Sequence, residues 1–281
     1  MEGIVGILLQ KRASLIDPDK SEIKNLFSNL LERSTTLGKN SSGIAVFNRS
    51  FSPTTIYVSH KKTTKYHKHD LYIYKAPCSP FELVKKEGYK KVIDKVGSDT
   101  VAILGYSGNK LTGNQPQYSE TICGVTSGNR SRVFESAKED YITLNKENSS
   151  KQLLHYIEKL QENRGIEFQD ALNQVFPKIK KTAAVVCNVE EDIDSFYLIR
   201  NGKPLAAKIW PTKQAFIFAS RKGFIPEAYK KASILNNKNL GPELQDVFFP
   251  DKSIYKIPLG LSYKKKHTWT NEIELFQLNS N

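Results

Sequence analysis

Short apolar segments separated by polar turns recur along the chain and predict a protein rich in β-strands. The first of them, residues 3–9, is continuously apolar after an initial glycine and is expected to form a buried strand. The segments with the same strand-like pattern are residues 43–47, 55–58, 71–74, 101–106, 121–125, 183–187, 196–200, 205–209, 215–219, 254–257 and 273–278.

Other stretches place their apolar residues at helical spacing. Residues 19–38 start with a capping-box-like pair, Asp19 and Glu22, and end at a glycine. Further helices are expected over residues 149–160 and 168–177, and a lysine-rich one over residues 83–96 that Gly88 weakens.

Two strand-rich halves with helices between and around them favour an α+β fold of two sheets packed face to face and covered by helices. We see no internal repeat and no linker long enough to divide the chain, so residues 1–281 are interpreted as a single domain. No apolar run approaches the ~20 residues that a membrane-spanning helix needs. Because Lys11 and Arg12 follow the first apolar run instead of preceding it, we expect a cytoplasmic protein and no secretory signal.

The chain is basic, with a formal net charge of +13. This charge raises the odds of a polyanionic partner, although lysine-rich surfaces are also common and solubilising. Lysines cluster in several segments, and tyrosines lie between some of them. The candidate polyanion contacts are Lys61, Lys62, Lys65, Lys68, Lys264, Lys265 and Lys266.

Cysteines and histidines give no pattern for a metal site or a cofactor, and we expect neither. Three widely spaced cysteines fit buried free thiols better than a disulfide or a metal cluster. His60, His67 and His69 with Asp70 have the donor types of a zinc site, but the surrounding lysines oppose a cation. A solvated basic loop is the preferred interpretation of that segment.

Several short segments, in order along most of the chain, together resemble the class II glutamine amidotransferases of the N-terminal-nucleophile hydrolase superfamily. They include the opening Gly3-Ile4-Val5-Gly6 and the stretch Tyr106-Ser107 followed by Gln115-Pro116. The remaining segments are residues 31–33, 41–46, 124–129, 148–151, 200–205 and 218–220. The resemblance implies a four-layer αββα sandwich of two mostly antiparallel sheets.

The positions that carry chemistry in that family are changed here. The family's chain begins Met-Cys, the methionine is removed, and the cysteine attacks glutamine; this chain has Glu2 at that position. The arginine that would bind the substrate carboxylate falls at Gly105, or at Ile103 in an alternative alignment. The asparagine that donates to the oxyanion becomes Ser127, although the following Gly128 keeps its backbone N–H, and the aspartate that binds the substrate amine becomes Ser149.

These changes predict a chain without glutaminase activity. A carboxylate is a poor nucleophile toward an amide, and loss of one oxyanion donor alone typically lowers the rate by ~10²–10³. We therefore expect a pseudoenzyme that regulates or scaffolds a protein partner. Two alternatives stay open. One is a basic module that contacts nucleic acid or a nucleoprotein. The other is a divergent amidohydrolase or amidotransferase that uses Glu2, Ser107, Ser127 or another residue on a different amide or nucleotide.

Overall fold

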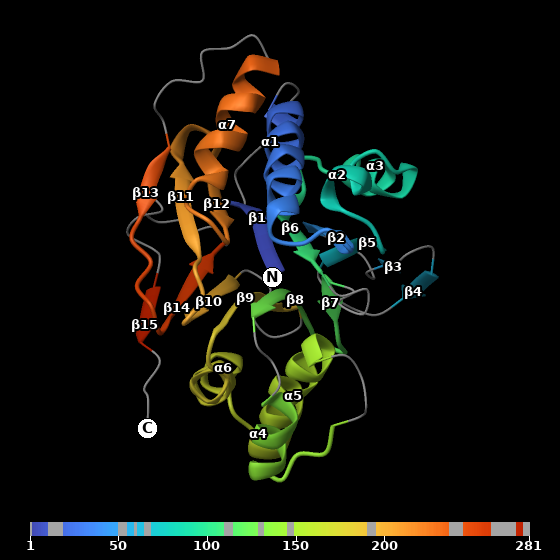
Figure 1. Ribbon diagram of the computed structural model, residues 1–281. Coiled ribbons are helices and arrows are strands. Elements are labelled where there is room, and N and C mark those ends of the chain that lie inside the picture. The colour runs from blue at the N-terminus through green and yellow to red at the C-terminus, as the bar shows by residue number, and fades with distance from the viewer. Residues whose placement is uncertain are drawn as a thin grey trace.

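Figure 1 shows the computed structural model, and the statements below concern the residues that it describes. These are residues 2–10, 19–49, 55–58, 61–64, 69–109, 115–128, 132–144, 149–189, 195–235, 244–259 and 274–277.

The larger sheet has β1 near its centre. In the described part of the chain its nine strands follow the order β13-β11-β12-β1-β6-β2-β5-β3-β4. All neighbours are antiparallel except β3 and β5, which are parallel. The strands are β1 (Glu2–Leu9), β2 (Ser41–Arg49), β3 (Thr55–Val58), β4 (Lys61–Thr64), β5 (His69–Ala76), β6 (Thr100–Gly108), β11 (Ala206–Trp210), β12 (Ala215–Ala219) and β13 (Gln245–Val247).

The smaller sheet is antiparallel throughout. Its six described strands follow the order β15-β14-β10-β9-β8-β7. They are β7 (Gln117–Tyr118), β8 (Ile122–Gly128), β9 (Thr182–Asn188), β10 (Ser195–Asn201), β14 (Ser253–Pro258) and β15 (Glu274–Gln277).

Helices cover the outer face of each sheet, which gives four layers (Figure 1). The larger sheet is covered by α1 (Asp19–Arg33), α2 (Pro80–Leu83), α3 (Glu87–Ile93) and α7 (Phe224–Leu235), and the smaller one by α4 (Val133–Glu139), α5 (Ser149–Arg164) and α6 (Phe168–Val175). Short 3₁₀ turns are η1 (Ser34–Thr36), η2 (Phe176–Lys178) and η3 (Pro211–Lys213). The predicted αββα sandwich is confirmed.

The alternation of side chains along β1 shows how the layers are held. Ile4 and Leu8 point into the core between the two sheets, whereas Val5, Ile7 and Leu9 point into the core under α1 and α7. Because both faces of the strand are buried, its sequence is apolar without interruption. An edge-to-face pair joins the sheets across the inner core, with the ring centroids of Phe47 and Phe196 5.3 Å apart.

Most of the expected elements are present, but one expected helix differs. Of the helix expected over residues 83–96, only Glu87–Ile93 is helical, as α3, while Leu83 ends the separate short helix α2. A capping box of Ser79 and Glu82 starts α2 at Pro80. Gly88 then lies in α3, where a Cβ would be 2.2 Å from the ring of Tyr74. The strands over residues 43–47 and 55–58 do not pair with each other, since β5 lies between them.

The two sheets do not follow the two halves of the sequence. β11 and β12 come from the second half, yet they extend the larger sheet beside β1. Two helices, α4 and α7, were not expected from the sequence. Of the three free cysteines, Cys123 and Cys187 are buried as expected, whereas Cys78 is only half-buried.

Candidate functional site

The start of β1 is held rigidly on both sides. Glu2 lies opposite Gly108 of β6. Two residues further on, the N–H of Ile4 donates to the Ser220 hydroxyl at 2.8 Å, and the Ser220 N–H donates back to the Ile4 carbonyl at 2.9 Å. The end of β12 thus fixes the strand that carries Glu2, as a site for chemistry requires.

The half-buried carboxylate of Glu2 joins the two sheets. One of its oxygens accepts a hydrogen bond from the Tyr106 hydroxyl of β6 at 3.0 Å. The other accepts from the backbone N–H of Gly128, at the end of β8 in the smaller sheet, at 3.0 Å. The structure therefore brings together Glu2 and Gly128, two of the positions that the sequence singled out.

Only glycine fits at position 128. Its φ is +116°, outside the usual range of residues with a side chain, and an added Cβ would lie 2.0 Å from the Lys181 carbonyl oxygen. This backbone directs the Gly128 N–H at the carboxylate of Glu2. At the position that resembles the family's oxyanion site, the remaining donor, the Gly128 N–H, is thus already hydrogen-bonded to the Glu2 carboxylate of the same chain.

Tyr106 is a site residue that the sequence did not indicate. Its side chain is fully buried, and its hydroxyl reaches Glu2 by passing beside Gly108, where an added Cβ would lie 2.2 Å from that oxygen. The resemblance marked the Tyr-Ser stretch only as a framework segment. The sequence signal that could have indicated Tyr106 is the alternation of side chains along β6, which places Tyr106 on the inner face of the sheet with Leu104.

Gly105, aligned with the substrate-binding arginine, lies away from Glu2. A Cβ on Gly105 would contact Val5, Phe27 and Leu31 at 2.9 to 3.1 Å, in the core under α1. A long polar side chain cannot enter that packed core without displacing its neighbours.

The three serines of the sequence analysis have different surroundings. Ser107 is fully buried, and its hydroxyl donates to the Ser34 carbonyl at 2.9 Å. Ser127 is 2% exposed and lies opposite Ala183 in the sheet. Ser149 is the first residue of α5, and its side chain lies outside the described part of the structure. The hydrogen bond of Ser107 is a structural one that ties β6 to the turn after α1.

Gln115 supports the segment of β8 that leads to Gly128. Its side-chain amide donates to the Thr126 carbonyl at 2.8 Å and accepts from the Thr126 N–H at 2.6 Å. The peptide bond before Pro116 is cis, and the Gln115 carbonyl packs directly on Gly43 of β2. The Gln-Pro pair, noticed in the sequence as part of the resemblance, thus links the two sheets.

A lysine and a cysteine between the sheets have altered ionisation. Lys75 is half-buried in β5 opposite Gly43. Burial lowers the pKa of Lys75 to about 8, against the opposing influence of nearby Cys123. Burial raises the pKa of the Cys123 thiol to about 12, although the charge of Lys75 favours the thiolate. At neutral pH the thiol is therefore protonated, and it is not an activated nucleophile.

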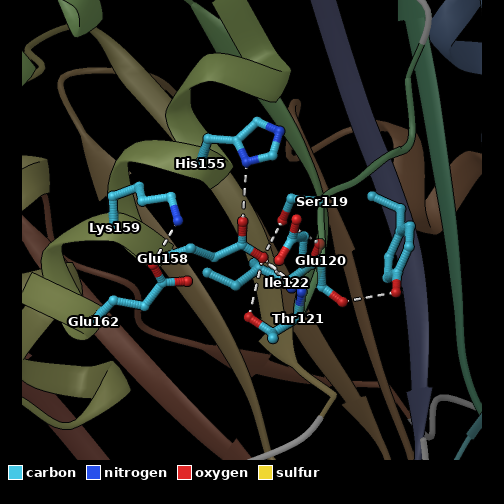
Figure 2. A network of polar contacts seen from close by, with 9 residues as sticks. Ser119, Glu120, Thr121, Ile122, His155, Glu158, Lys159 and Glu162 are labelled. Carbon is cyan, nitrogen blue, oxygen red and sulfur yellow. Dashed lines mark hydrogen bonds and ion pairs between the residues drawn. The ribbon is translucent and has the colours of Figure 1, made fainter. Parts of the chain in front are cut away.

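Figure 2 shows a second buried carboxylate, Glu158 of α5, whose role is structural. It accepts hydrogen bonds from the Ser119 hydroxyl at 2.6 Å, from the Thr121 N–H at 2.6 Å and from the Ile122 N–H at 3.1 Å, while His155 lies 3.2 Å away. Burial alone would raise the pKa of Glu158, but these hydrogen bonds outweigh it and hold the pKa below the ordinary value. The contacts fix the turn between β7 and β8 on α5.

Most of the candidate polyanion contacts cannot be placed. Lys61 and Lys62 lie in the edge strand β4, and their side chains are not described. Lys65, Lys68, Lys264, Lys265 and Lys266 lie outside the described residues, as do His60 and His67. Within the described ranges, no group of three or more histidine, cysteine, aspartate or glutamate residues is arranged for a metal ion. In those ranges no helix is both long and apolar enough to cross a bilayer.

No protein-family model matches the chain, and no curated protein matches it significantly. Solved structures do. Glutamine phosphoribosylpyrophosphate (PRPP) amidotransferase from B. subtilis, complexed with ADP and GMP, matches with a TM-score of 0.57 at 13% identity over 99% of this chain and 50% of that one. A structure of the allosteric regulatory enzyme of purine biosynthesis matches with a TM-score of 0.58 at 12% identity over 99% of this chain and 49% of that one.

These similarities define the fold. The chain shares its four-layer fold with the glutamine PRPP amidotransferase structure and with the allosteric regulatory enzyme of purine biosynthesis. It spans about half the length of the two solved structures that it matches.

Proposed function

We propose that this chain is an amidotransferase-like protein without glutaminase activity that acts as a regulatory or structural component of a protein complex. The observation that carries the proposal is the hydrogen bond from the Gly128 N–H to the carboxylate of Glu2, 3.0 Å long. In an active site of this type, that donor must be available to the oxyanion that forms during attack on an amide.

The chemistry at Glu2 supports the same conclusion. Attack on an amide requires a nucleophile that is activated by a lowered pKa or by an adjacent base. Glu2 supplies a carboxylate, and that carboxylate already accepts two hydrogen bonds from Tyr106 and Gly128. A substrate would have to displace these contacts before it reached the end of β1.

The alternative of a divergent amidohydrolase has less support. It would need a nucleophile other than cysteine, and the candidates that the sequence named were Glu2, Ser107 and Ser127, with another residue also left open. The Ser107 hydroxyl is buried and donates to a backbone carbonyl. Ser127 is also buried. In the described part of the chain, neither serine has a histidine or carboxylate hydrogen-bonded to its hydroxyl as a base.

Ammonia release from glutamine tests the enzymatic part of the proposal. The chain is purified with a C-terminal tag, so that its N-terminus is natural, and its intact mass shows whether Met1 is kept. We expect Met1 to be retained because Glu2 is a large residue, and no ammonia above the blank. The Glu2→Cys variant is the matched comparison. We expect it also to be inactive, because Gly105 replaces the arginine that would bind the substrate carboxylate and faces the packed core. Glutaminase activity of the unmodified chain would refute the proposal.

The protein-partner part is tested separately. The tagged chain is isolated from its own cells at physiological salt and analysed by size-exclusion chromatography with light scattering. We expect elution above the 31.8 kDa of the single chain together with a second protein in fixed ratio. Recovery of the free chain alone at that mass would count against a scaffolding or regulatory role.

A further inference from the structure

Two pockets lie next to each other on the surface, and the residues that line them are far from Glu2 in the sequence. Both are lined by the connection from β10 to β11 and by residues 246–252, which lead from β13 into β14. The larger pocket has a volume of about 460 Å³ and includes Arg200, Lys222 and Phe248. The smaller one has a volume of about 270 Å³ and includes Lys180, Lys181 and Lys252. We call these lining residues together the 200/250 surface.

Positive charge dominates the 200/250 surface. It carries five cationic side chains: Lys180, Lys181, Arg200, Lys222 and Lys252. Its two carboxylates are already engaged.

Asp246 forms an ion pair with Lys208 at 3.0 Å. Asp251 accepts a hydrogen bond from the Gly202 N–H at 2.7 Å and lies 3.8 Å from the Nε of Arg200. Among the described residues, no hydrogen bond or ion pair engages the side chains of the three lysines around the smaller pocket. The surface therefore has cationic side chains available for an anionic partner.

Phe248 adds an aromatic face to this charge. Its side chain is 82% exposed, which is unusual for phenylalanine. The neighbouring Phe249 is 4% exposed, and its ring packs edge to face on Tyr255 with centroids 4.4 Å apart. The Phe249 carbonyl accepts from Arg200 at 2.5 Å, and the Phe248 carbonyl accepts from the Tyr255 hydroxyl. Because the backbone is fixed on both sides, Phe248 is presented to solvent by a rigid segment.

The lysines around the smaller pocket are also placed by a defined backbone. Lys181 and Lys252 have positive φ values of 57° and 52°, and Gly202 between them has a φ of 75°. Residues with side chains rarely adopt this conformation. The three turns that meet at the pocket thus come from distant parts of the sequence and hold their lysines close to one site.

We propose that the 200/250 surface binds single-stranded nucleic acid, with Phe248 stacking on an unpaired base and the cationic side chains contacting phosphates. Proteins that bind single strands combine a positively charged groove with exposed aromatic faces. Four of the five cations are lysines, and lysine is depleted in protein–protein interfaces. That composition favours a polyphosphate over an acidic protein. The proposal does not depend on the Glu2 site.

The test is fluorescence anisotropy of a labelled 20-nucleotide oligo(dT) titrated with the purified full chain. We expect saturable binding that weakens as KCl is raised from 50 to 300 mM, because bound cations release counterions from the strand. The Phe248→Ala variant should weaken binding about tenfold at fixed salt, since stacking on one base accounts for ~1–3 kcal/mol. The Phe248→Trp variant should restore it.

A matched pair of triple variants tests the placement of the charges. Replacing Lys180, Lys181 and Lys252 by alanine should reduce the slope of log Kd against log [KCl] by about 2, at ~0.7 per phosphate contact. Replacing Lys85 and Lys86, which lie between α2 and α3, together with Lys90 of α3 removes the same charge elsewhere on the molecule, and should leave the slope nearly unchanged. Equal effects of the two triple variants would show that binding depends only on the overall charge of the chain, and would overturn the proposal.

Three other results would also overturn the proposal. The first is the absence of oligo(dT) binding at 50 mM KCl. The second is equal affinity for a 20-base-pair duplex, since paired bases do not stack on Phe248. The third is tighter binding of polyglutamate than of oligo(dT) with the same dependence on Phe248, which would assign the surface to an acidic protein. Circular dichroism of each variant confirms that it is folded.

Discussion

The Glu2 site and the 200/250 surface differ in how far their polar groups are satisfied. At Glu2, the carboxylate accepts hydrogen bonds from a tyrosine hydroxyl of the larger sheet and from a glycine N–H of the smaller sheet. On the 200/250 surface, Lys180, Lys181 and Lys252 stand around a pocket with an exposed Phe248 nearby. Polar groups that are paired inside the fold stabilise it, whereas groups left for solvent are available to a partner. In this comparison, the groups that are left for a binding partner lie on the 200/250 surface and not at the Glu2 carboxylate.

The largest expected effect on stability is at the Glu2 site. Replacing Gly128 by alanine should lower the free energy of unfolding by about 3–5 kcal/mol, because the Cβ would clash with Lys181 and the backbone conformation is unfavourable for a side chain. Urea denaturation measures the change. Gly165→Ala is the matched control: its φ is +59°, but nothing lies within 4 Å of a Cβ, so the cost should be only about 1 kcal/mol. Similar costs for both variants would remove the steric argument at Gly128.

The buried acid that fixes the β7–β8 turn should have the next largest effect. Replacing Glu158 by glutamine keeps one acceptor oxygen but loses the charge, and should lower the free energy of unfolding by about 2 kcal/mol at pH 7. The folded-state pKa of Glu158 is lowered from 4.5, so its stabilisation is present above pH 4.5 and is lost as the pH falls through the lower folded value. Denaturation curves of the variant should therefore depend less on pH below 4.5. An unchanged acid dependence would contradict the assignment.

Removing the carboxylate of Glu2 should cost somewhat less, since the side chain is only half-buried. Glu2→Ala leaves the Tyr106 hydroxyl and the Gly128 N–H without this acceptor, and should lower the free energy of unfolding by about 1–2 kcal/mol. Glu2→Gln keeps an acceptor and should cost about half as much. If both variants are as stable as the unmodified chain, the hydrogen bonds of Glu2 do not stabilise the fold.

The smallest expected effect on stability is at the 200/250 surface. Phe248→Ala should change the free energy of unfolding by no more than about 0.5 kcal/mol, because the side chain is 82% exposed and packs on little. Thermal unfolding monitored by circular dichroism checks this. A large loss of stability would show that Phe248 belongs to the core packing and is not a free aromatic face.

The sequence was most informative where burial alone determines the structure. The continuous apolar run of β1 indicated a buried strand, and the apolar stripe of residues 19–38 indicated a helix with one face in the core. The pattern of strands and helices favoured two sheets covered by helices, and the resemblance specified this as a four-layer αββα sandwich. The sheet to which each strand belongs was less accessible, because the sequences of β11 and β12 indicate strands without showing which sheet they join.

The candidate site was predicted only in part. Glu2 and Gly128 were named from the sequence, but their hydrogen bond was not, since it joins strands far apart along the chain and in different sheets. Tyr106 was missed because a buried tyrosine and a site tyrosine have the same pattern. Phe248 was missed for the opposite reason: an apolar residue beside Phe249 is expected inside, and only the fold shows that one of the two rings is buried and the other exposed.

Hydrogen exchange at the Gly128 amide tests the central claim most directly. If the Glu2 carboxylate occupies this donor, NMR should show a protected Gly128 amide in the unmodified chain, and protection should fall about tenfold or more in Glu2→Ala. The Gly202 amide, which donates to the Asp251 carboxylate at 2.7 Å, is the internal control and should be unaffected. Equal exchange of Gly128 in the two proteins would contradict the account, because the donor would then be available to an oxyanion.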